Sequence, residues 1–284
     1  MQAAVPTAPI GIFDSGIGGL SVLQALREAL PHERFVYVAD SGHAPYGERG
    51  ADFVRQRSQA ITEHLLQEHG IKLLVVACNT ATAAAITHLR ALWPQLLLVG
   101  VEPAIKPAAA LTRTGHVGVM ATRGTVTSVR FEGLLQTFGG AVRWQVQACD
   151  GLARAIEAST WQADGNAAEI EALCARYTKD LGDFGQNPGQ IDTLVLGCTH
   201  YVFARHVLQR LLGPQVQLLD TGRAVAQQTQ RLLQQTQLLA STVSDAPPCP
   251  VQLFTTGVLP ALQAAAARWL HLPGPCCSVA RALL

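Results

Sequence analysis

Short apolar runs alternate with amphipathic stretches along the whole chain. Nine runs rich in Val, Ile and Leu predict β-strands, at 10–13, 35–39, 73–77, 96–101, 117–120, 142–147, 193–196, 216–219 and 251–255. Several of these runs are apolar throughout rather than at alternate positions, which is typical of strands covered by helices on both faces. Strands that alternate with helices predict an α/β fold with parallel sheets.

Residues 51–69 illustrate the helical pattern between strands. Positions at helical spacing predict one buried stripe, interrupted by Arg57 and His64: Phe53, Ala60, Ile61 and Leu65. Gly70 then predicts the C-terminal end of the helix. Domain boundaries are predicted where a strand runs into two prolines at 99–107 and at Gly213, while the proline-containing segment 241–250 predicts a loop.

Composition and charge exclude several classes of protein. The 284 residues carry a formal net charge of only +1 and no run of Lys or Arg, so neither nucleic acid nor a membrane surface is expected as a partner. No uncharged apolar stretch reaches the roughly 18 residues that a transmembrane helix needs. The first residues also lack the pattern of a signal peptide. We therefore expect a soluble, cytoplasmic protein.

Two of the seven cysteines stand at equivalent positions. Cys78 follows the apolar run 73–77, Cys198 follows 193–196 and Gly197, and each precedes polar residues. A thiol at the start of a helix meets the positive end of the helix dipole, which lowers its pKa and favours thiolate. His200 is close enough in sequence to exchange a proton with Cys198. Two such thiols suit a reaction that removes a proton from one face of a carbon and returns one to the other. The alternative is that each is a small buried apolar residue.

The other cysteines predict no second centre. There is no C-x-x-C pair, so neither a zinc ribbon nor a secreted disulfide framework is expected, and free thiols are. Cys149 is a candidate to line the same cleft, and Cys174 lies inside the helical pattern 168–180 and is expected in the core. Three more lie in proline-rich or terminal segments: Cys249, Cys276 and Cys277.

Two loops that follow strands carry candidate binding residues. In I-G-I-F-D-S-G-I-G-G-L-S (10–21) a strand ends at Asp14, and the glycines allow a tight turn whose amides and carboxylate face the cleft. The spacing is not that of a dinucleotide fold, and the alternative role of Asp14 is a helix cap. After 35–39, the loop of Pro45, Tyr46 and Gly47 predicts backbone amides and an aromatic ring beside a small ligand, with His43 as an exposed loop residue.

A cofactor bound as a Schiff base would need a lysine, and the lysines are poorly placed for it. Lys72 enters a strand, Lys106 lies between prolines, and Lys179 lies on a polar helix face. We therefore expect chemistry without a cofactor.

Several separated motifs, in order, resemble the glutamate racemases of the aspartate/glutamate racemase superfamily: D-S-G-I-G-G-L-S, P-Y-G-E, V-A-C-N-T-A-T, V-G-V-E-P-A, G-C-T-H-Y and T-T-G at 255–257. The match covers nearly the whole chain. The resemblance implies cofactor-independent interconversion of L- and D-glutamate, which supplies D-glutamate for peptidoglycan. It also implies two doubly wound parallel-sheet α/β domains that face each other across a central active-site cleft. The first would comprise residues 1–103 and 213–284, and the second residues 104–212; a homodimer is compatible with the pattern.

The resemblance also implies a role for each matching residue. Cys78 and Cys198 match two acid/base thiols on opposite faces of the substrate Cα, one thiolate while the other is thiol. Asp14 matches the carboxylate that assists Cys78, His200 the imidazole that assists Cys198, and Glu157 a further acid. The positions that match substrate contacts are Asp14, Ser15, Tyr46, Gly47, Asn79, Thr80, Thr122, Thr199 and His200. Asp40 matches a family aspartate without a defined role, and no metal ligand is implied.

The chain departs from the family pattern in one loop. Family members often carry prolines after the cysteine that Cys149 matches, whereas this chain has Asp150 and Arg154. This difference leaves open where the loop places Glu157. The segment from Pro273 onward matches nothing in the family.

Three alternatives compete with glutamate racemisation. A racemase of the same superfamily could act on aspartate or hydantoins, but aspartate racemases tend to carry glutamate after Cys-Thr, where this chain has His200. A non-catalytic binding protein would be expected to lack one thiol or its helper. A zinc or redox protein is the third, and Cys-Thr-His spacing is unlike that of structural zinc sites.

Overall fold

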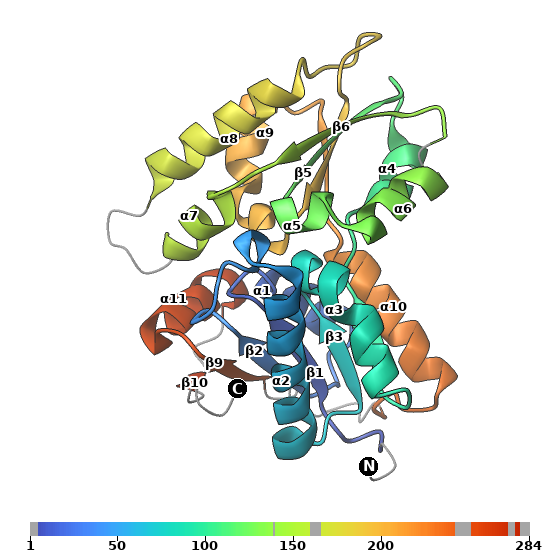
Figure 1. Cartoon of the computed structure of the whole chain (residues 1–284), viewed down its shortest axis with the longest axis vertical. Coiled ribbons are helices and arrows are strands. Elements are labelled where there is room, and N and C mark those ends of the chain that lie inside the picture. The colour runs from blue at the N-terminus through green and yellow to red at the C-terminus, as the bar shows by residue number, and fades with distance from the viewer. Residues whose placement is uncertain (1–4, 139, 160–165, 242–250, 272–275, 279–284) are drawn as a thin grey trace.

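The computed structural model describes residues 5–138, 140–159, 166–241, 251–271 and 276–278. The predicted fold class is confirmed, because the helices surround two separate parallel sheets. Figure 1 shows the two α/β units stacked along the long axis of the molecule. Blue, cyan and orange-to-red elements form one unit, and green-to-yellow elements form most of the other.

The first sheet combines the first and the last described strands of the chain. As far as the chain is described, its strand order is β10-β9-β2-β1-β3-β4, and every pairing is parallel. Its strands are β1 (Ile10–Asp14), β2 (Phe35–Ala39), β3 (Leu73–Val76), β4 (Leu97–Gly100), β9 (Val251–Thr255) and β10 (Cys276–Ser278). Every residue of β1, β2 and β3 is buried, as their uninterrupted apolar sequence predicts.

The second sheet lies in the middle of the chain. Its described strands have the order β6-β5-β7-β8, again all parallel. They are β5 (His116–Ala121), β6 (Arg143–Ala148), β7 (Thr193–Gly197) and β8 (Gln217–Leu219). The edge strand β6 is largely exposed, whereas the central β7 is fully buried.

Helices cover both faces of the first sheet. Ile10 and Ile12 enter a core formed with α1, α10 and α11. Phe13 lies on the other face of the sheet, in a core formed with α2 and α3. These helices are α1 (Leu20–Ala29), α2 (Ala51–His69), α3 (Asn79–Leu92), α10 (Gly222–Gln235) and α11 (Leu259–Leu270). A short 3-10 helix, η1 (Tyr46–Glu48), lies between β2 and α2.

The second sheet is covered in the same way. Val117 and Val119 pack with α4 and α6, while Met120 and Leu194 enter the core on the other face with α8 and α9. The helices of this unit are α4 (Ile105–Leu111), α5 (Arg123–Val126), α6 (Val129–Phe138), α7 (Leu152–Ala158), α8 (Ala167–Leu181), the 3-10 helix η2 (Thr199–Ala204) and α9 (Arg205–Leu212).

All nine predicted strands are present within about a residue of their predicted bounds. The tenth, β10, was not predicted, because a three-residue C-C-S strand has no apolar run to mark it. The domain limits themselves stay a prediction. Since β8 pairs with β7 in the second sheet, we propose that the chain returns to the first domain after Leu219 rather than at residue 213.

Helix α2 has the predicted bounds, but its buried face differs from the predicted stripe. The fully buried positions are Val54, Ser58, Ile61, Thr62 and Leu65. Two of them are polar and were therefore overlooked: Ser58 Oγ donates to the Val54 carbonyl and Thr62 Oγ1 to the Ser58 carbonyl, so both hydroxyls are satisfied inside the helix. The helix ends at Gly70, which has a φ of 57° and is in the left-handed conformation that glycine favours there.

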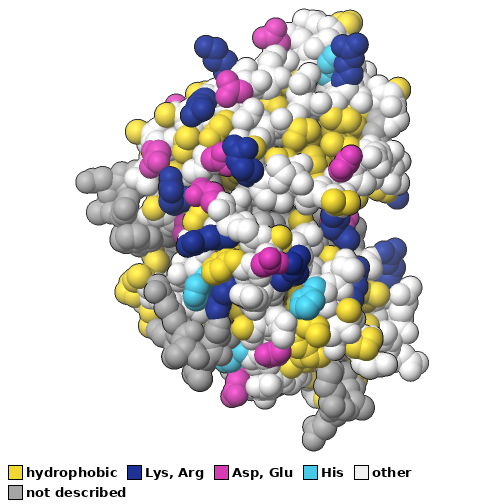
Figure 2. All heavy atoms as spheres, viewed as in Figure 1, with side chains coloured by type: hydrophobic (Ala, Val, Ile, Leu, Met, Phe, Trp, Pro, Cys, Tyr) yellow, Lys and Arg dark blue, Asp and Glu magenta, His cyan; other side chains and the backbone are white. Residues whose placement is uncertain are grey.

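Two properties of the whole molecule bear on its partners. Within the described residues, no helix is both long enough and apolar enough to span a bilayer. On the face shown in Figure 2, basic and acidic side chains are interspersed rather than gathered by sign.

Candidate active site

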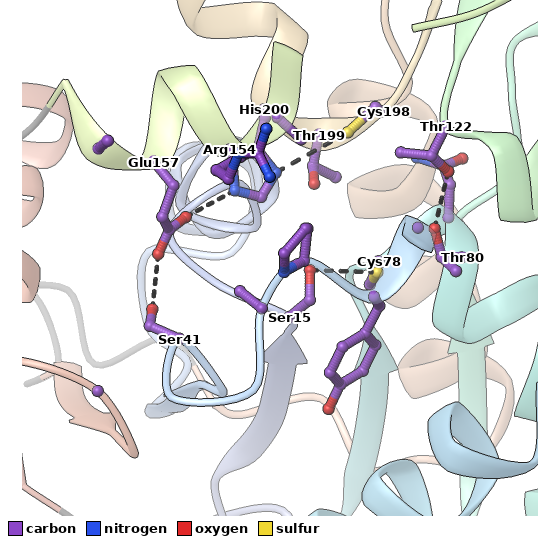
Figure 3. A pocket seen from close by; sticks show the side chains of 18 of the residues that line it. Ser15, Ser41, Cys78, Thr80, Thr122, Arg154, Glu157, Cys198, Thr199 and His200 are labelled. Atoms are coloured by element: carbon purple, nitrogen blue, oxygen red, sulfur yellow. Dashed lines mark hydrogen bonds and ion pairs between the residues drawn. The ribbon is translucent and has the colours of Figure 1, made fainter. Parts of the chain in front are cut away.

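A cavity of about 260 Å³ lies between the two units. The carboxyl ends of strands from both sheets point toward it. Eleven of the twelve predicted site residues line it: Ser15, Tyr46, Gly47, Cys78, Asn79, Thr80, Thr122, Glu157, Cys198, Thr199 and His200. The twelfth, Asp14, is fully buried behind the lining. Figure 3 shows Cys78 and Ser15 on one wall and Cys198, His200 and Glu157 on the other.

Cys78 stands at the junction between β3 and α3. It is the N-cap of α3, its Sγ accepts the Ala81 backbone N–H at 3.4 Å, and it is 5% exposed. Burial raises the pKa of the Cys78 thiol, and the Asp14 charge raises it further, against the opposing Ala81 N–H and Ser15 contacts. The expectation that the helix end alone would lower this pKa was therefore wrong, because the thiol is desolvated. Burial therefore favours the thiol form of Cys78.

Asp14 is connected to Cys78 through Ser15. The Ser15 hydroxyl lies 3.4 Å from Asp14 Oδ1 and 3.7 Å from Cys78 Sγ. The other carboxylate oxygen accepts the Gly19 backbone N–H at 2.6 Å, and Thr199 Oγ1 lies 3.4 Å away. Burial raises the pKa of Asp14 above its ordinary value even though His200 opposes the shift. A carboxyl group with a raised pKa beside a thiol is suited to proton exchange.

Cys198 follows β7 as Cys78 follows β3, but the next segment differs. Its Sγ lies 3.8 Å from His200 Nδ1, and η2, a 3-10 helix, follows instead of a long α-helix. The Cys198 side chain makes no capping hydrogen bond. The predicted repetition of the Cys78 arrangement is thus only partial: an imidazole, rather than a helix amide, is the polar neighbour of this thiol.

His200 and Glu157 form a partly buried ion pair beside Cys198. His200 Nε2 lies 2.7 Å from Glu157 Oε2. Burial alone would lower the pKa of His200, but its hydrogen bonds to Cys198 and Glu157 outweigh burial and raise the pKa well above the ordinary histidine value. Burial would raise the pKa of Glu157, and the hydrogen bond from His200 is the largest of several that together lower it. Both pKa shifts favour the charged forms of the pair, imidazolium and carboxylate.

Polar groups from both units meet at the far side of the cavity. Thr80 Oγ1 on α3 and Thr122 Oγ1 at the start of α5 share a hydrogen bond of 2.9 Å, and Thr125 contacts Thr122 at the same distance. The buried Asn79 Oδ1 has no hydrogen-bond partner among the described residues. An unpaired buried amide oxygen that lines a cavity is suited to accept a hydrogen bond from a ligand.

The loop that carries Tyr46 and Gly47 is fixed by Asp40. The Tyr46 hydroxyl donates to Asp40 Oδ2 at 2.5 Å, so the tyrosine presents its ring and backbone to the cavity. His43 Nδ1 lies 2.9 Å from Asp40 Oδ1, and its side chain is only 25% exposed. The prediction of an exposed, unengaged His43 was therefore wrong.

The altered loop after Cys149 still places Glu157 in the site. Cys149 is buried and does not line the cavity, since its Sγ points to the Gln147 carbonyl. Asp150 pairs with Arg123 on the surface, and Arg154 lines the cavity mouth 3.9 Å from Glu48 of η1. The two residues that depart from the family pattern, Asp150 and Arg154, thus lie at the rim of the cavity. Glu157 on α7 still lines it.

Cys174 and the three lysines lie away from the cavity. Cys174 is fully buried in α8, as expected. Lys72 pairs with the buried Glu33 at 2.6 Å, Lys106 lies over the Phe138 ring, and Lys179 is in the last turn of α8. Cys249 lies outside the described residues, as do the side chains of Cys276 and Cys277. Within the described part of the chain, no three His, Cys, Asp or Glu residues are grouped as a metal site would require.

Pro45 lines the cavity with Tyr46 and Gly47, as its loop predicts. Several other lining residues were not predicted from sequence: Ser41, Ala44, Ala153, Arg154, Ala158, Gly257, Val258 and Ala261. Ser41 is the one with a short polar contact to a predicted site residue, since its hydroxyl donates to Glu157 Oε1 at 2.7 Å. Its position two residues after β2 could have marked it as a site residue. Serines are common in such loops, however, so the position alone does not single it out.

Comparison with known proteins places this geometry in context. The model of the Asp/Glu/hydantoin racemase family matches residues 10–229. A glutamate racemase of Ectopseudomonas mendocina (strain ymp) is 52% identical over 239 residues, which is 84% of this chain and 87% of that protein.

Solved structures agree with the match in sequence. The crystal structure of a glutamate racemase from Bacillus anthracis has a TM-score of 0.81 at 30% identity, covering 96% of this chain and 98% of that chain. The crystal structure of Escherichia coli glutamate racemase in complex with L-glutamate and the activator UDP-MurNAc-ala has a TM-score of 0.79 at 30% identity, again covering 96% and 98%.

Proposed function

The chain belongs to the Asp/Glu/hydantoin racemase family, and on that basis we propose that it interconverts L- and D-glutamate without a cofactor, using Cys78 and Cys198 as two acid/base thiols. The observation that carries the proposal is the position of these thiols. They come from different sheets, each follows the carboxyl end of a buried strand, and both line one cavity. Opposite walls of a cleft can reach opposite faces of one carbon.

The proposed reaction balances with one proton taken and one given. In one direction the Cys78 thiolate takes the Cα proton, so an S–H bond forms as the Cα–H bond breaks and the electron pair stays on the substrate. The Cys198 thiol then protonates the opposite face and is left as thiolate. In the other direction the two cysteines exchange roles.

Each thiol has its own helper in this proposal. Asp14, with its raised pKa, exchanges a proton with Cys78 across the short path through Ser15. His200, kept protonated by Glu157, stabilises the Cys198 thiolate or supplies its proton. Thiolate formation therefore relies on a different group at each wall of the cleft.

The substrate would be bound by the polar lining between the thiols. Hydroxyls of Thr80, Thr122 and Thr199 can donate to a carboxylate, and donors at that position stabilise the charge that develops when Cα is deprotonated. The unpaired Asn79 Oδ1 suits the substrate ammonium group. Ser15 and the backbone at Tyr46 and Gly47 offer donors for the second carboxylate.

The biological setting follows from the family resemblance. We infer that the D-glutamate product supplies peptidoglycan synthesis and that the protein works in the cytoplasm. A homodimer stays a prediction of the same resemblance. Racemisation of aspartate or hydantoins is the second candidate, and the imidazole of His200 beside Cys198 favours glutamate over aspartate.

The proposal is tested by Cα deuterium incorporation. L-glutamate, D-glutamate and L-aspartate are each incubated in deuterated water and followed by proton NMR and optical rotation. We expect both glutamate enantiomers to racemise with deuterium incorporation, and Cys78→Ser or Cys198→Ser to slow racemisation by about 10³-fold, as loss of a positioned acid/base group does. Each variant should still exchange the enantiomer that its remaining thiol reaches.

Cys174→Ser is the matched control, because Cys174 is equally buried but lies in α8 away from the cavity. Full racemisation by both active-site variants would rule out the two-thiol mechanism. Turnover of L-aspartate but not of L-glutamate would rule out the substrate.

A further inference from the structure

Glu157 belongs to the second unit but is held by the first. Ser41 Oγ donates to Glu157 Oε1 at 2.7 Å, and the Ile17 backbone N–H donates to Oε2 at 2.9 Å. A Cβ added to Gly16 would lie 2.3 Å from Oε2. Only a residue without a side chain therefore lets the turn between β1 and α1 come this close to the carboxylate. Two donors from the first unit therefore fix both oxygens of a side chain on α7.

Ser41 lies on a loop that is itself tightly held. The adjacent Asp40 carboxylate is fully buried and accepts a hydrogen bond from Thr256 Oγ1 at 2.7 Å. On the other side, the Gly42 backbone N–H donates to the same hydroxyl at 3.1 Å. A Cβ at Gly257 would lie 2.7 Å from the Ser41 Cβ, so the segments are in close contact. The Ser41 hydroxyl is thus presented to Glu157 from a fixed position.

The contacts continue from Glu157 to one thiol and not to the other. Glu157 binds His200 Nε2, and His200 Nδ1 lies 3.8 Å from Cys198 Sγ; Figure 3 shows the three contacts from Ser41 to Cys198 in series. Cys78 instead contacts Ser15, the Ala81 N–H and Asp14. Orientation of the imidazole therefore affects Cys198 directly and Cys78 only at a distance.

We propose that Ser41 is a positioning residue through which the first unit orients Glu157 and His200 at Cys198, so that this half of the reaction is assembled only when the two units are in contact. The inference rests on the proposed two-thiol racemisation. It assigns to Ser41 an effect on one half-reaction, whereas a residue that simply bound substrate or stabilised the fold would affect both.

The test measures each half-reaction alone. Ser41→Ala is introduced into Cys78→Ser, where Cys198 is the remaining active-site thiol, and into Cys198→Ser, where Cys78 is. Cα deuterium exchange is then measured for the enantiomer that each background exchanges. We expect a loss of about tenfold in the Cys198-only background, since a hydrogen bond to a charged group is removed, and a change within about twofold in the other.

Two further variants connect the effect to Glu157. Glu157→Gln should cause a selective loss on the Cys198 side, and adding Ser41→Ala to it should lower exchange no further, because both changes act on one contact. Ser41→Thr keeps the hydroxyl and should retain most of the Cys198-side rate, including where Ser41→Ala proves too unstable to assay.

Ser21→Ala is the matched control. The Ser21 hydroxyl also reaches the second unit, at the Thr199 carbonyl 3.3 Å away, but does not contact Glu157. It should leave the ratio of the two exchange rates unchanged, and its thermal unfolding midpoint provides the reference for Ser41→Ala. Equal loss in both backgrounds, or no loss in either, would overturn the role of Ser41. Absence of exchange in both parent backgrounds would instead overturn the two-thiol mechanism.

Discussion

Among single residues, Asp40 carries a buried charge that holds neighbouring segments of the cavity wall in position, although it does not line the cavity. Its carboxylate is fully buried and is contacted by four side chains: Arg57, Tyr46, His43 and Thr256. The Arg57 pair is bidentate, at 2.9 and 2.8 Å. Because the partners come from α2, from the loop after β2 and from the end of β9, Asp40 connects the segments that shape one wall of the cavity.

Replacing Asp40 should therefore destabilise the protein as well as the site. Asp40→Asn leaves the Arg57 guanidinium without its carboxylate in a buried setting, and we expect a loss of about 3 kcal/mol in the free energy of unfolding, measured by urea denaturation. Asp52→Asn is the control, because it removes an Asp–Arg pair on the exposed face of the same helix. It should leave the unfolding curve unchanged.

The same residue should make stability sensitive to acid. Burial would raise the pKa of Asp40, but the hydrogen bond from Arg57 and those from its other partners lower it below the ordinary value. This contribution is complete above the unfolded pKa of about 4 and is lost as pH falls through the lower folded value. Between pH 6 and pH 3, Asp40→Asn should lose less stability than the parent; an equal loss would contradict this.

Sequence predicted more of the residues that line the cavity than of the residues that hold them in position. Cys78, Cys198 and Asp14 could be singled out because each lies at or directly after the end of a buried strand, a feature local to the sequence. Ser41 could not, since its partner Glu157 is 116 positions away. The direction of the pKa shift of Cys78 was also mispredicted, because desolvation depends on atoms that only the fold brings around the thiol.

Among the elements, the turn between β1 and α1 sets how closely the two units approach. A Cβ at Gly18 would lie 2.3 Å from His200 Nδ1 and 2.6 Å from Thr199 Oγ1. Contacts this short force the imidazole or the turn to move. The glycines of this turn are therefore needed for close approach to η2, in addition to forming a tight turn.

Gly18→Ala should consequently impair catalysis. We expect kcat/KM to fall by about 100-fold, because displacement of a catalytic group by about 1 Å has an effect of that size. Gly50→Ala, at the start of α2, is the control, since nothing lies within 4 Å of the added Cβ. Retention of full activity by Gly18→Ala would show that the turn can yield without moving His200.

Elements were predictable where their sequence was repetitive. Nine strands and the bounds of α2 follow from apolar runs and a terminating glycine. The buried face of α2 was misassigned because Ser58 and Thr62 satisfy their hydroxyls within the helix, which a count of apolar residues overlooks. The segment η2 was expected to resemble the start of α3, but a 3-10 helix intervenes.

In the whole molecule, the cavity of the proposed reaction is lined by residues of both units, so neither sheet alone could form it. Both sheets direct the carboxyl ends of their strands toward one cavity, and contacts such as Thr80 with Thr122 and Ser41 with Glu157 join the units across it. Sequence predicted two units, but which loops would meet depends on how the units face each other. That orientation is the part of the site that sequence patterns could not supply without the family resemblance.

This arrangement predicts two half-reactions with different pH dependence. L- and D-glutamate have equal free energies in water, so kcat/KM must be the same in both directions at every pH. Comparing kcat/KM in the two directions therefore cannot reveal a difference between the two thiols. The difference becomes measurable when each thiol works alone, in the Cys78→Ser or Cys198→Ser variant.

In Cys198→Ser, Cα deuterium exchange should rise about tenfold per pH unit from pH 6 to pH 9. Burial, followed by the Asp14 charge, raises the pKa of Cys78 above this range, so its thiolate fraction grows tenfold with each unit. In Cys78→Ser, exchange should show no inflection near pH 6.5, because contacts with Cys198 and Glu157 outweigh burial and hold the pKa of His200 well above that value. A plateau below pH 7 in the first variant would mean that substrate binding reverses the desolvation of Cys78. An inflection near pH 6.5 in the second would mean that Glu157 does not hold His200 as imidazolium.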